Sequence, residues 1–333
     1  MSRHVRAALC TAYGPPEDVV VEDVPSPDLG PGQVRVRVSA AAVNFPDVLL
    51  VQDRYQLSVP PPFVPGSELA GVVTEVADDL AAGGPAVGDR VAATTFVGAF
   101  AEEVVVDAAV VSPVPGGVDL RHAAAFGVAH KTAYHTLRSV ARLQRGEELV
   151  VLGAGGGVGL AAVQLGVLMG ASVTAVASSP AKLDAAAAAG ATHLIDHRSV
   201  ELRPALREAL PDGSDVVVDP VGGKLSEPAL RSLGWGGRFV TVGYAAGDIP
   251  RIPLNLVLLK GCRILGFEFR SFATNAPDEV RRNDDELTDL LASGRIVPHI
   301  GATFALDETA AALRHVADGK AVGKIVIDVA AGG

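Results

Sequence analysis

The chain has 333 residues, which is more than one hydrophobic core of ordinary size organises, so two domains are expected. Its formal net charge of -10, without any basic run, excludes a nucleic-acid surface, and its two cysteines, Cys10 and Cys262, exclude a disulfide framework. The expected ligand is therefore a small molecule, and the expected location is the reducing cytoplasm.

The first third of the chain has the pattern of a β-rich domain. Residues 34–43, "VRVRVSAAAV", alternate in polarity before the turn "NFPD", and "LAGVVTEVA" and "AEEVVV" follow as short strands. After about residue 127, strands and helices alternate, which predicts a parallel sheet covered by helices. Its six strands are expected at "ELVVLG", "SVTAVA", "HLID", "DVVVDP", "GRFVTVG" and "CRILGFEF".

The run from Val158 to Ala177 is apolar enough to raise the question of a membrane span. Gly170, Ala171 and Ser172 divide it into a piece of helix length and a strand rich in β-branched residues. That division is typical of elements buried in a doubly wound sheet, so no membrane contact is expected.

The glycines of "VLGAGGGVGLAAVQLG" lie where a strand turns into a helix. Ala154, Gly156 and Gly159 keep the spacing of the G-x-G-x-x-G dinucleotide motif, with alanine in place of the first glycine. Gly156 lets a pyrophosphate approach the backbone, and Gly159 lets the helix contact the strand. Because N–H groups at a helix start favour phosphate, this turn is predicted to bind a dinucleotide rather than to serve packing alone.

The end of the second strand of this sheet distinguishes between the two nicotinamide cofactors. Ser178 stands where NAD-binding units usually carry a carboxylate for the ribose 2'-hydroxyl. Ser178 and Ser179 can donate hydrogen bonds, Lys182 adds a cation, and His197 and Arg198 could reach the same place. In the alternative interpretation, Ser179 only caps a helix and Lys182 is an ordinary surface charge. The missing acid and the nearby cation together favour NADPH.

Further segments stand in an order that points to a family: "AAVNFPDVLLVQDRYQ", "PFVPGSELAGVV", "VGDRV", "KTAYHTL", "DPVGG" and "GKIVI". With them, the chain resembles the medium-chain dehydrogenase/reductase superfamily, in its zinc-independent quinone oxidoreductase branch, over essentially its whole length. The resemblance implies an α/β fold with a GroES-like β-barrel domain, residues 1–127 and 268–333. It also implies a doubly wound Rossmann domain, residues 128–267, with a six-stranded parallel sheet, a cleft between the domains that holds NADPH, and a homodimer joined along the last Rossmann strand.

The two zinc sites of related dehydrogenases have no counterpart in this sequence. Zinc-binding members carry a Cys ligand after an early strand, a Gly-His-Glu motif and a lobe with four close cysteines. Here "NFPD" stands at the first place, Ser67 replaces the histidine of the second, and no cysteine cluster follows "GDRV". The resemblance therefore implies no metal, and hydrogen-bond donors must polarise the acceptor.

The resemblance also assigns roles to single residues. It implies that Asn44 and Asp47 lie near the nicotinamide and Thr132 on its other side, although Asp47 could equally be a helix-start residue beside Pro46. Tyr55 has the spacing of a proton-donating tyrosine in related enoyl-thioester reductases, or else it is an aromatic residue at a rim. The cofactor contacts so implied are Asn44, Thr132, Gly156, Gly157, Val158, Ser178, Lys182, His197, Val242, Phe267 and Phe269.

The expected activity is transfer of hydride from NADPH to a small-molecule acceptor, either a quinone or another conjugated carbonyl. Leu49 stands where some bacterial quinone reductases have a second tyrosine, so an acryloyl- or crotonyl-type enoyl thioester is an open alternative. A non-catalytic NADPH-binding protein is the third interpretation, because a fold does not guarantee chemistry. The polar set Asn44, Asp47, Tyr55 and Thr132 argues against it.

Overall fold

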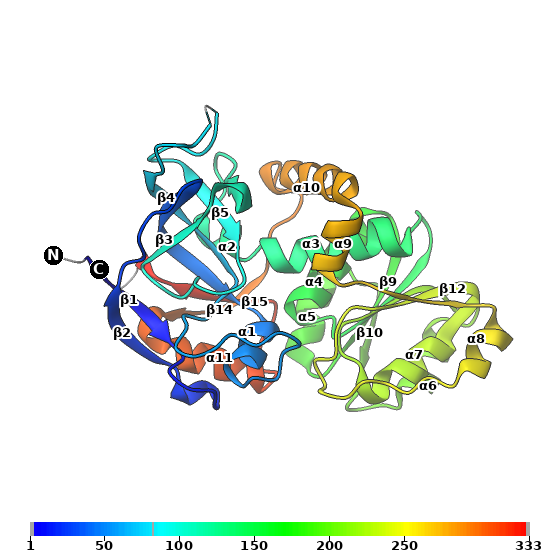
Figure 1. The fold of residues 1–333 in the computed structure, drawn as a ribbon. Coiled ribbons are helices and arrows are strands. Elements are labelled where there is room, and N and C mark those ends of the chain that lie inside the picture. Colours follow the sequence, from blue (N-terminus) through cyan, green and yellow to red (C-terminus); the bar gives the residue numbers. More distant parts are fainter. Residues whose placement is uncertain (1–2, 82, 331–333) are drawn as a thin grey trace. The chain divides into compact units, whose positions relative to one another are not determined.

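The computed structural model describes residues 3–81 and 83–330, which fall into two units (Figure 1). Unit 1 runs to Val128 and resumes at Ile300, and unit 2 spans Ala129–His299. Each unit has a hydrophobic core of its own, with Phe100 fully buried in unit 1 and Phe239 buried in unit 2. In the part of the chain so described, no helix has the length and apolar character needed to cross a membrane.

Unit 1 is built on a seven-stranded sheet with the order β14-β15-β3-β4-β5-β7, in which β6 also pairs with β3. Its strands and helices are β1 (His4–Leu9), β2 (Val20–Pro25), β3 (Gln33–Val43), α1 (Phe45–Val51), β4 (Glu68–Val76), β5 (Arg90–Thr94), β6 (Glu103–Asp107), β7 (Val111–Pro113), α2 (Leu120–Ala124), β14 (Ile300–Ala305), α11 (Thr309–Ala317) and β15 (Lys324–Asp328). Short 3-10 turns lie at Pro16–Asp18, Ala108–Val110 and Leu306–Glu308. The β-rich first domain predicted from the alternating sequence is confirmed.

Strand β3 lies in the middle of this sheet, with β15 on one side and β4 on the other. The last residue of β3, Val43, is opposite Ile325, and the preceding Ala42 is opposite Glu68. The end of β3 therefore meets the start of β4 and the start of β15, although these segments are far apart in the sequence. In Figure 1, the red β15 runs beside the blue β3.

Unit 2 contains a six-stranded sheet with the order β10-β9-β8-β11-β12-β13, and all of its pairs are parallel. Its strands are β8 (Glu148–Leu152), β9 (Ser172–Ala177), β10 (His193–Asp196), β11 (Ser214–Asp219), β12 (Leu233–Thr241) and β13 (Arg263–Gly266). Its helices are α3 (Gly127–His135), a π-helical segment (Thr136–Ala141), α4 (Gly157–Leu168), α5 (Pro180–Ala188), α6 (Leu202–Ala209), a 3-10 turn (Gly223–Leu225), α7 (Ser226–Ser232), α8 (Leu254–Lys260), α9 (Phe269–Asn275) and α10 (Pro277–Ala292). The six predicted strands and the doubly wound fold are confirmed.

The long apolar run of the sequence is resolved into two buried elements of unit 2. Helix α4 ends at Leu168 and β9 begins at Ser172, with Gly170 in a left-handed conformation (φ 87°) at the turn between them. In the sheet, β9 pairs with β8 and β10, and most of its side chains are buried. Its hydrophobicity is therefore explained by its position inside the sheet.

The segment 268–299 lies in unit 2, whereas the sequence analysis assigned residues 268–333 to the first domain. Helix α10 is attached to α3 by polar contacts that the sequence pattern does not reveal. Asn283 Nδ2 lies 2.9 Å from His135 Nδ1 and 2.9 Å from Ser139 Oγ, and Lys131 Nζ donates to Asp284 at 2.8 Å. The chain returns to unit 1 only at β14.

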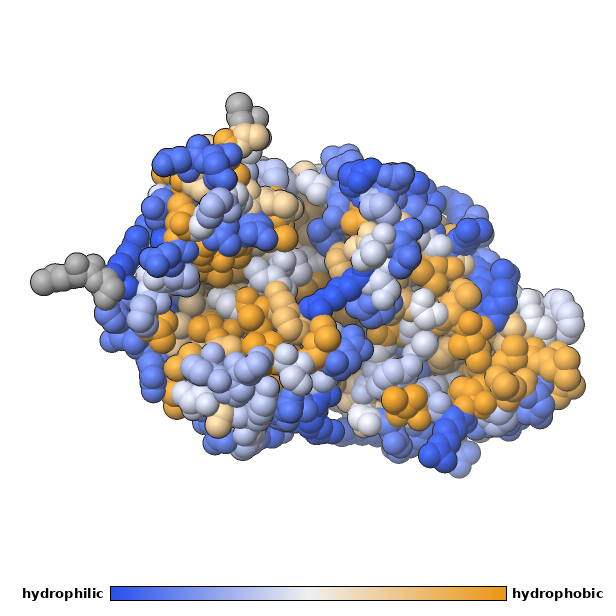
Figure 2. Space-filling model, in the orientation of Figure 1, coloured by the Kyte–Doolittle hydropathy of each residue, from blue (hydrophilic) through white to orange (hydrophobic). Residues whose placement is uncertain are grey.

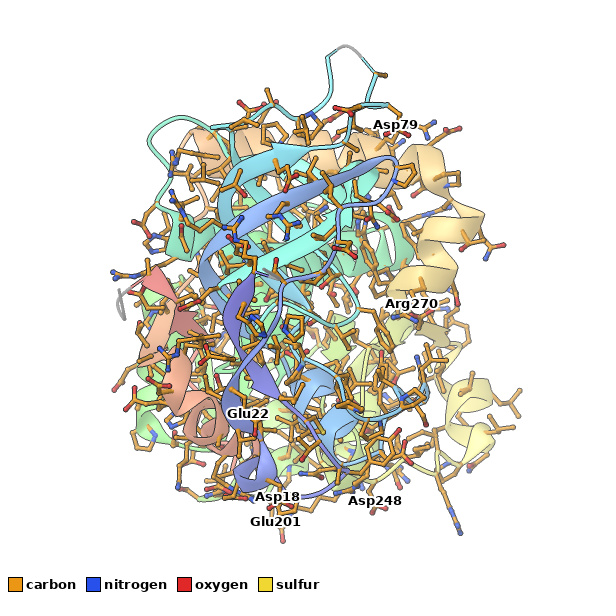
Figure 3. All side chains as sticks on the ribbon, turned by 60° about the vertical axis from the view of Figure 1, so that its left-hand side comes forward. Asp18, Glu22, Asp79, Glu201, Asp248 and Arg270 are labelled. Atoms are coloured by element: carbon orange, nitrogen blue, oxygen red, sulfur yellow. The ribbon has the colours of Figure 1, made fainter. Side chains whose placement is uncertain are left out.

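Acidic side chains and an apolar area are two features of the surface. Asp18, Glu22, Asp79, Glu201 and Asp248, labelled in Figure 3, are all exposed. Figure 2 shows an apolar area over α8, at the right of the view. The apolar patch of unit 2 consists of exposed side chains that the structure brings near α8 and β12: Trp235, Ile249, Leu254, Leu258 and Leu259, which are 69% to 84% exposed.

Candidate active site

Asn44 lies at the turn from β3 into α1, where it is the N-terminal cap of the helix. Its backbone N–H donates to Asp47 Oδ2 at 2.7 Å, and Pro46 stands in the first helical turn. Asp47 therefore has the helix-start role that the sequence left open as an alternative to function. Its side chain is fully buried, which is unusual for a carboxylate that only caps a helix.

A buried ion pair fixes the side chain of Asn44. Lys324 Nζ, at the start of β15, contacts Glu68 Oε1, at the start of β4, and donates to Asn44 Oδ1 at 2.6 Å. Asn44 Nδ2 in turn donates to Glu68 Oε1 at 3.0 Å and to Ser67 Oγ at 3.2 Å. Because an ammonium group has no acceptor, Lys324 must face the amide oxygen, so the Asn44 amide has one possible orientation.

Glu68 is satisfied at both of its oxygens. Its Oε2 accepts a hydrogen bond from the backbone N–H of Val128 at 2.7 Å, while Oε1 faces Lys324 and Asn44. Glu68 is 1% exposed and Lys324 4% exposed, so neither charge has compensation from bulk water. Removing one partner of such a pair costs about 3–5 kcal/mol, because the other charge is left buried alone.

The Asp47 carboxyl is the most perturbed acid of this group. Burial raises its pKa to about 7, and Glu68 acts in the same direction. The Asn44 N–H, the Ser67 hydroxyl and the Lys324 ammonium act against this rise. Among the described residues, Asp47 Oδ1 is buried and makes no hydrogen bond of normal geometry, although Ser67 is close enough to lower the pKa. A protonated carboxyl near neutral pH fits this environment.

We call Asn44, Asp47, Ser67, Glu68 and Lys324 the polar cluster of unit 1. Sequence analysis identified the first two residues as candidates and considered Ser67 only as a missing zinc ligand; Glu68 and Lys324 were not singled out. Both lie inside segments that carried the resemblance, "PFVPGSELAGVV" and "GKIVI". A charged side chain at the end of an apolar strand usually reaches solvent. The pairing of β3 with both β4 and β15 shows that Glu68 and Lys324 instead contact each other.

Tyr55 belongs to unit 1 as well, in the loop that follows α1. It is partly buried and packs against Phe96, with ring centroids 6.4 Å apart and planes tilted by 41°. Thr132 lies in α3 and belongs to unit 2. The structure thus brings Asn44 and Asp47 into one hydrogen-bonded group.

The glycine-rich turn of unit 2 joins β8 to α4. Gly153 has φ 61°, and a Cβ at Gly159 would lie 2.1 Å from the carbonyl oxygen of Gly153, so a side chain there would push the helix away from the turn. A Cβ at Gly155 would lie 2.3 Å from Lys182 Cβ. Gly156 is the N-terminal cap of α4, and Gly157 and Val158 form its first turn. This close approach of helix and strand fits a dinucleotide pyrophosphate.

Basic groups gather at the ends of β9 and β10. Lys182, in the first turn of α5, donates to Ser178 Oγ at 3.3 Å; burial lowers its pKa, and the nearby Arg198 lowers it further. Burial likewise lowers the pKa of His197, which also faces Arg198 and Lys224. Like charges collected on a partly buried surface repel one another and attract an anion, and one carboxylate, that of Asp196, already lies near His197 and raises its pKa. The group Ser178, Lys182, His197 and Arg198 therefore fits the 2'-phosphate that the sequence predicts.

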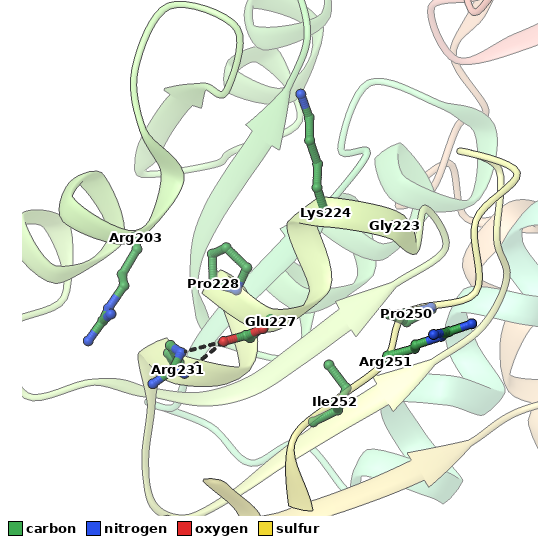
Figure 4. Close-up of a pocket in the computed structure, with 9 residues that line it drawn as sticks. All are labelled: Arg203, Gly223, Lys224, Glu227, Pro228, Arg231, Pro250, Arg251 and Ile252. Carbon is green, nitrogen blue, oxygen red and sulfur yellow. Dashed lines mark hydrogen bonds and ion pairs between the residues drawn. The ribbon is translucent and has the colours of Figure 1, made fainter.

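Lys224 is an addition that the sequence analysis did not make, although it directly follows "DPVGG". It also borders a pocket between α7 and the chain before α8, shown in Figure 4. In that pocket Arg231 pairs with Glu227 at 2.9 and 2.7 Å, while Lys224 extends away from this pair (Figure 4). Lys224 also acts electrostatically on His197, where it helps to lower the pKa of the imidazole.

The other expected cofactor contacts lie elsewhere in unit 2. Val242 follows β12, and its N–H donates to the carbonyl of Asp219 at 2.8 Å. Phe267 is buried, with its ring stacked 6.1 Å from His135 and 5.5 Å from Phe272. Phe269 begins α9 and lies 5.6 Å from His135. Phe267 and Phe269 thus take part in an aromatic group around His135, which the sequence pattern did not predict.

Comparisons with known proteins agree with both units. A family model for the alcohol dehydrogenase GroES-like domain matches residues 30–116, and a zinc-binding dehydrogenase model matches residues 157–286. A quinone oxidoreductase-like protein 2 homolog of Nematostella vectensis is 35% identical over 97% of this chain and 88% of its own length. The chain belongs to the quinone oxidoreductase-like family of medium-chain dehydrogenases/reductases.

Two solved structures of family members extend the comparison. A probable oxidoreductase from Mycobacterium abscessus is 34% identical, with a TM-score of 0.89 over 99% of this chain and 100% of its own. The quinone oxidoreductase of Thermus thermophilus, solved alone and in complex with NADPH, is 32% identical, with a TM-score of 0.83 over 97% of this chain and 100% of its own.

The raised pKa of Asp47 predicts a pH-dependent stability. Its folded-state pKa, about 7, lies above the ordinary value near 3.9, so between these values the folded protein holds a proton that the unfolded chain has released. The free energy of unfolding should therefore fall as the pH rises through this range, by at most about 1.4 kcal/mol per pH unit. In Asp47→Asn this contribution is absent, while the acceptor for the Asn44 N–H is kept. Urea unfolding of both proteins between pH 4 and 8 measures the difference; parallel curves would contradict the assignment.

Proposed function

We propose that this member of the family is an NADPH-dependent oxidoreductase that reduces a quinone or another conjugated carbonyl without zinc. Its cofactor is NADPH, which when bound supplies a hydride. The observation that carries the proposal is the polar cluster of unit 1, a set of buried hydrogen-bonding groups beyond what the fold of a strand-to-helix turn needs. Buried polar groups with perturbed pKa values favour a catalytic site.

The residues of unit 2 support the cofactor half of the proposal. Gly156 and the first turn of α4 would hold the pyrophosphate, and Ser178 with Lys182 would hold the 2'-phosphate. No carboxylate stands at position 178 to repel that phosphate. The NADPH complex of the Thermus thermophilus relative supports the same choice of cofactor.

The absence of zinc from the mechanism is supported by side-chain chemistry. Ser67 offers a hydroxyl where zinc-binding relatives have an imidazole, and a neutral hydroxyl is a poor zinc ligand. Within residues 3–81 and 83–330, no three His, Cys, Asp or Glu side chains are placed to hold a metal ion together. Negative charge that grows on an acceptor oxygen must then be stabilised by a hydrogen-bond donor such as the Ser67 hydroxyl, which the Asn44 amide holds in place.

Tyr55 supports an alternative acceptor, an enoyl thioester. Reduction of such a substrate leaves an enolate that must be protonated at carbon, which a phenol can do as a general acid. Tyr55 packs on Phe96 by its ring, so its hydroxyl end is positioned by an apolar contact. A quinone has oxygens at both reacting ends and needs no protonation at carbon.

The activity is tested by following NADPH oxidation in a chelator, first with a small quinone and then with a crotonyl thioester. We expect turnover with at least one acceptor, and the chelator should not reduce it. In Tyr55→Phe the thioester rate should fall by at least about tenfold and the quinone rate should persist. Tight NADPH binding without turnover of any acceptor would instead indicate a non-catalytic binding protein.

Lys182→Ala tests the cofactor choice. A charged hydrogen bond contributes about 1.5–3 kcal/mol, so the variant should bind NADPH roughly ten- to a hundredfold more weakly, while its affinity for NADH stays nearly constant. Lys320→Ala, which removes an exposed lysine of unit 1, is the matched control. Fluorescence titration of wild type and both variants with NADPH and with NADH measures these affinities. Equal losses for NADPH and NADH in Lys182→Ala would refute the 2'-phosphate site.

We also propose that two copies pair along β13, which is an edge strand of the unit 2 sheet and lies next to β12. An edge strand beside exposed apolar side chains favours pairing with a second copy. Light scattering should report twice the chain mass, and Leu258→Asp, in the apolar patch, should reduce it to one chain. Val87→Asp, at an exposed valine of unit 1, is the control. A wild-type monomer at micromolar concentration would count against pairing.

A further inference from the structure

Ser67 is the member of the polar cluster through which the cluster reaches solvent. Asp47 is 0% exposed, Glu68 1%, Lys324 4% and Asn44 8%, whereas Ser67 is only partly buried. Its backbone is held in place, because its carbonyl accepts a hydrogen bond from the N–H of Thr95 at 2.8 Å. A molecule that approaches the cluster therefore meets the Ser67 side chain.

The hydrogen bonds of the cluster determine which way the Ser67 hydroxyl can donate. Lys324 fixes the oxygen of the Asn44 amide, so the Asn44 nitrogen must face Ser67 and donate to its oxygen at 3.2 Å. Ser67 Oγ is thus already an acceptor on this side, and its own proton is left for a partner elsewhere. Two groups can accept a hydrogen bond from this hydroxyl: the carboxylate of an ionised Asp47, or the oxygen of a bound acceptor.

Asp47 supplies the second observation. Its Oδ2 is held by the Asn44 N–H at 2.7 Å, while Oδ1 is buried without a hydrogen bond of normal geometry among the described residues. An unpartnered buried carboxylate oxygen is costly, and a proton on Oδ1 removes that cost. The charged groups near Asp47 are Lys324 from β15 and Glu68 from β4, which pair with each other and leave the carboxyl without a cation of its own.

We propose that Ser67 and Asp47 form a proton relay, in which the Ser67 hydroxyl donates to the oxygen of the acceptor and is resupplied by the Asp47 carboxylic acid. This inference rests on the reductase activity proposed above. It gives Ser67 a catalytic role that is separate from that of Tyr55, since Ser67 serves an oxygen and Tyr55 a carbon.

The proton balance of the relay is simple. A quinone gains a hydride from NADPH and one proton, and its two carbonyls become the two hydroxyls of a hydroquinone; in another conjugated carbonyl the hydride goes to the β-carbon and the protonated oxygen is that of an enol. As the O–H bond of Ser67 breaks, the proton passes to the acceptor oxygen, and the proton of Asp47 Oδ1 passes to Ser67 Oγ. Asp47 is left as a carboxylate, which takes a proton from water after the product leaves. Lys324 and Glu68 keep their charges throughout and hold Asn44 in place.

The test compares wild type with Ser67→Ala and Asp47→Asn, using NADPH, a small quinone and a range of pH on both sides of 7. In wild type, kcat should fall as the pH rises through about 7, because Asp47 must carry its proton. Ser67→Ala should lower kcat by about a hundredfold and abolish this pH dependence, while NADPH affinity stays the same. Ser112→Ala, at an exposed serine of β7, is the matched control.

Asp47→Asn separates chemistry from folding, because asparagine fits the same space and still accepts from the Asn44 N–H. The relay also predicts that kcat of wild type is lower in D2O than in H2O. If Ser67→Ala does not fold, the relay is supported when Asp47→Asn loses both this isotope effect on kcat and the pH dependence of kcat. A folded Ser67→Ala that keeps the wild-type rate and pH profile overturns the relay and leaves the reductase activity standing. Absence of turnover in wild type with every acceptor overturns both.

Discussion

The contact of Lys324 with Glu68 and Asn44 is the constraint on which the polar cluster of unit 1 depends. A buried ammonium needs a compensating carboxylate, and both need hydrogen bonds at every remaining position. Both groups find these partners where β3 ends between β4 and β15. The order of the strands in the sheet therefore determines which residues form the polar cluster. Lys324 and Glu68 are 256 residues apart in the sequence and become neighbours only in the folded sheet.

The same contact explains why an acid of raised pKa occurs beside it. The charge of Lys324 is already compensated by Glu68, so little of it is left to stabilise an ionised Asp47. Burial then dominates, and the carboxyl favours its protonated form. In place of a metal-ligating histidine, position 67 has a serine hydroxyl that the Asn44 amide orients, close to a carboxyl of raised pKa.

Sequence reasoning predicted the fold well because the relevant signals are local. The glycine spacing from Gly153 to Gly159 and the six strand patterns need only neighbouring residues, and the structure confirms them. The contact of Asn283 with His135, which attaches α10 to unit 2, joins residues that are 148 positions apart. It has no local signal, so the place of residues 268–299 in unit 2 could not be predicted from the sequence. The contact of Lys324 with Glu68 also joins residues far apart in the sequence. A charged residue at the end of a strand is usually exposed, so the sequence does not indicate that these two are buried.

Burial raises the pKa of Asp47 to about 7, so about half of this carboxyl is protonated at neutral pH. Infrared difference spectra of wild type against Asp47→Asn, recorded as the pH is raised, measure it directly through the C=O band of a carboxylic acid. We expect this band below pH 7 and its loss with a midpoint at about pH 7. A band that is already lost near pH 4, where an ordinary aspartate ionises, would contradict it.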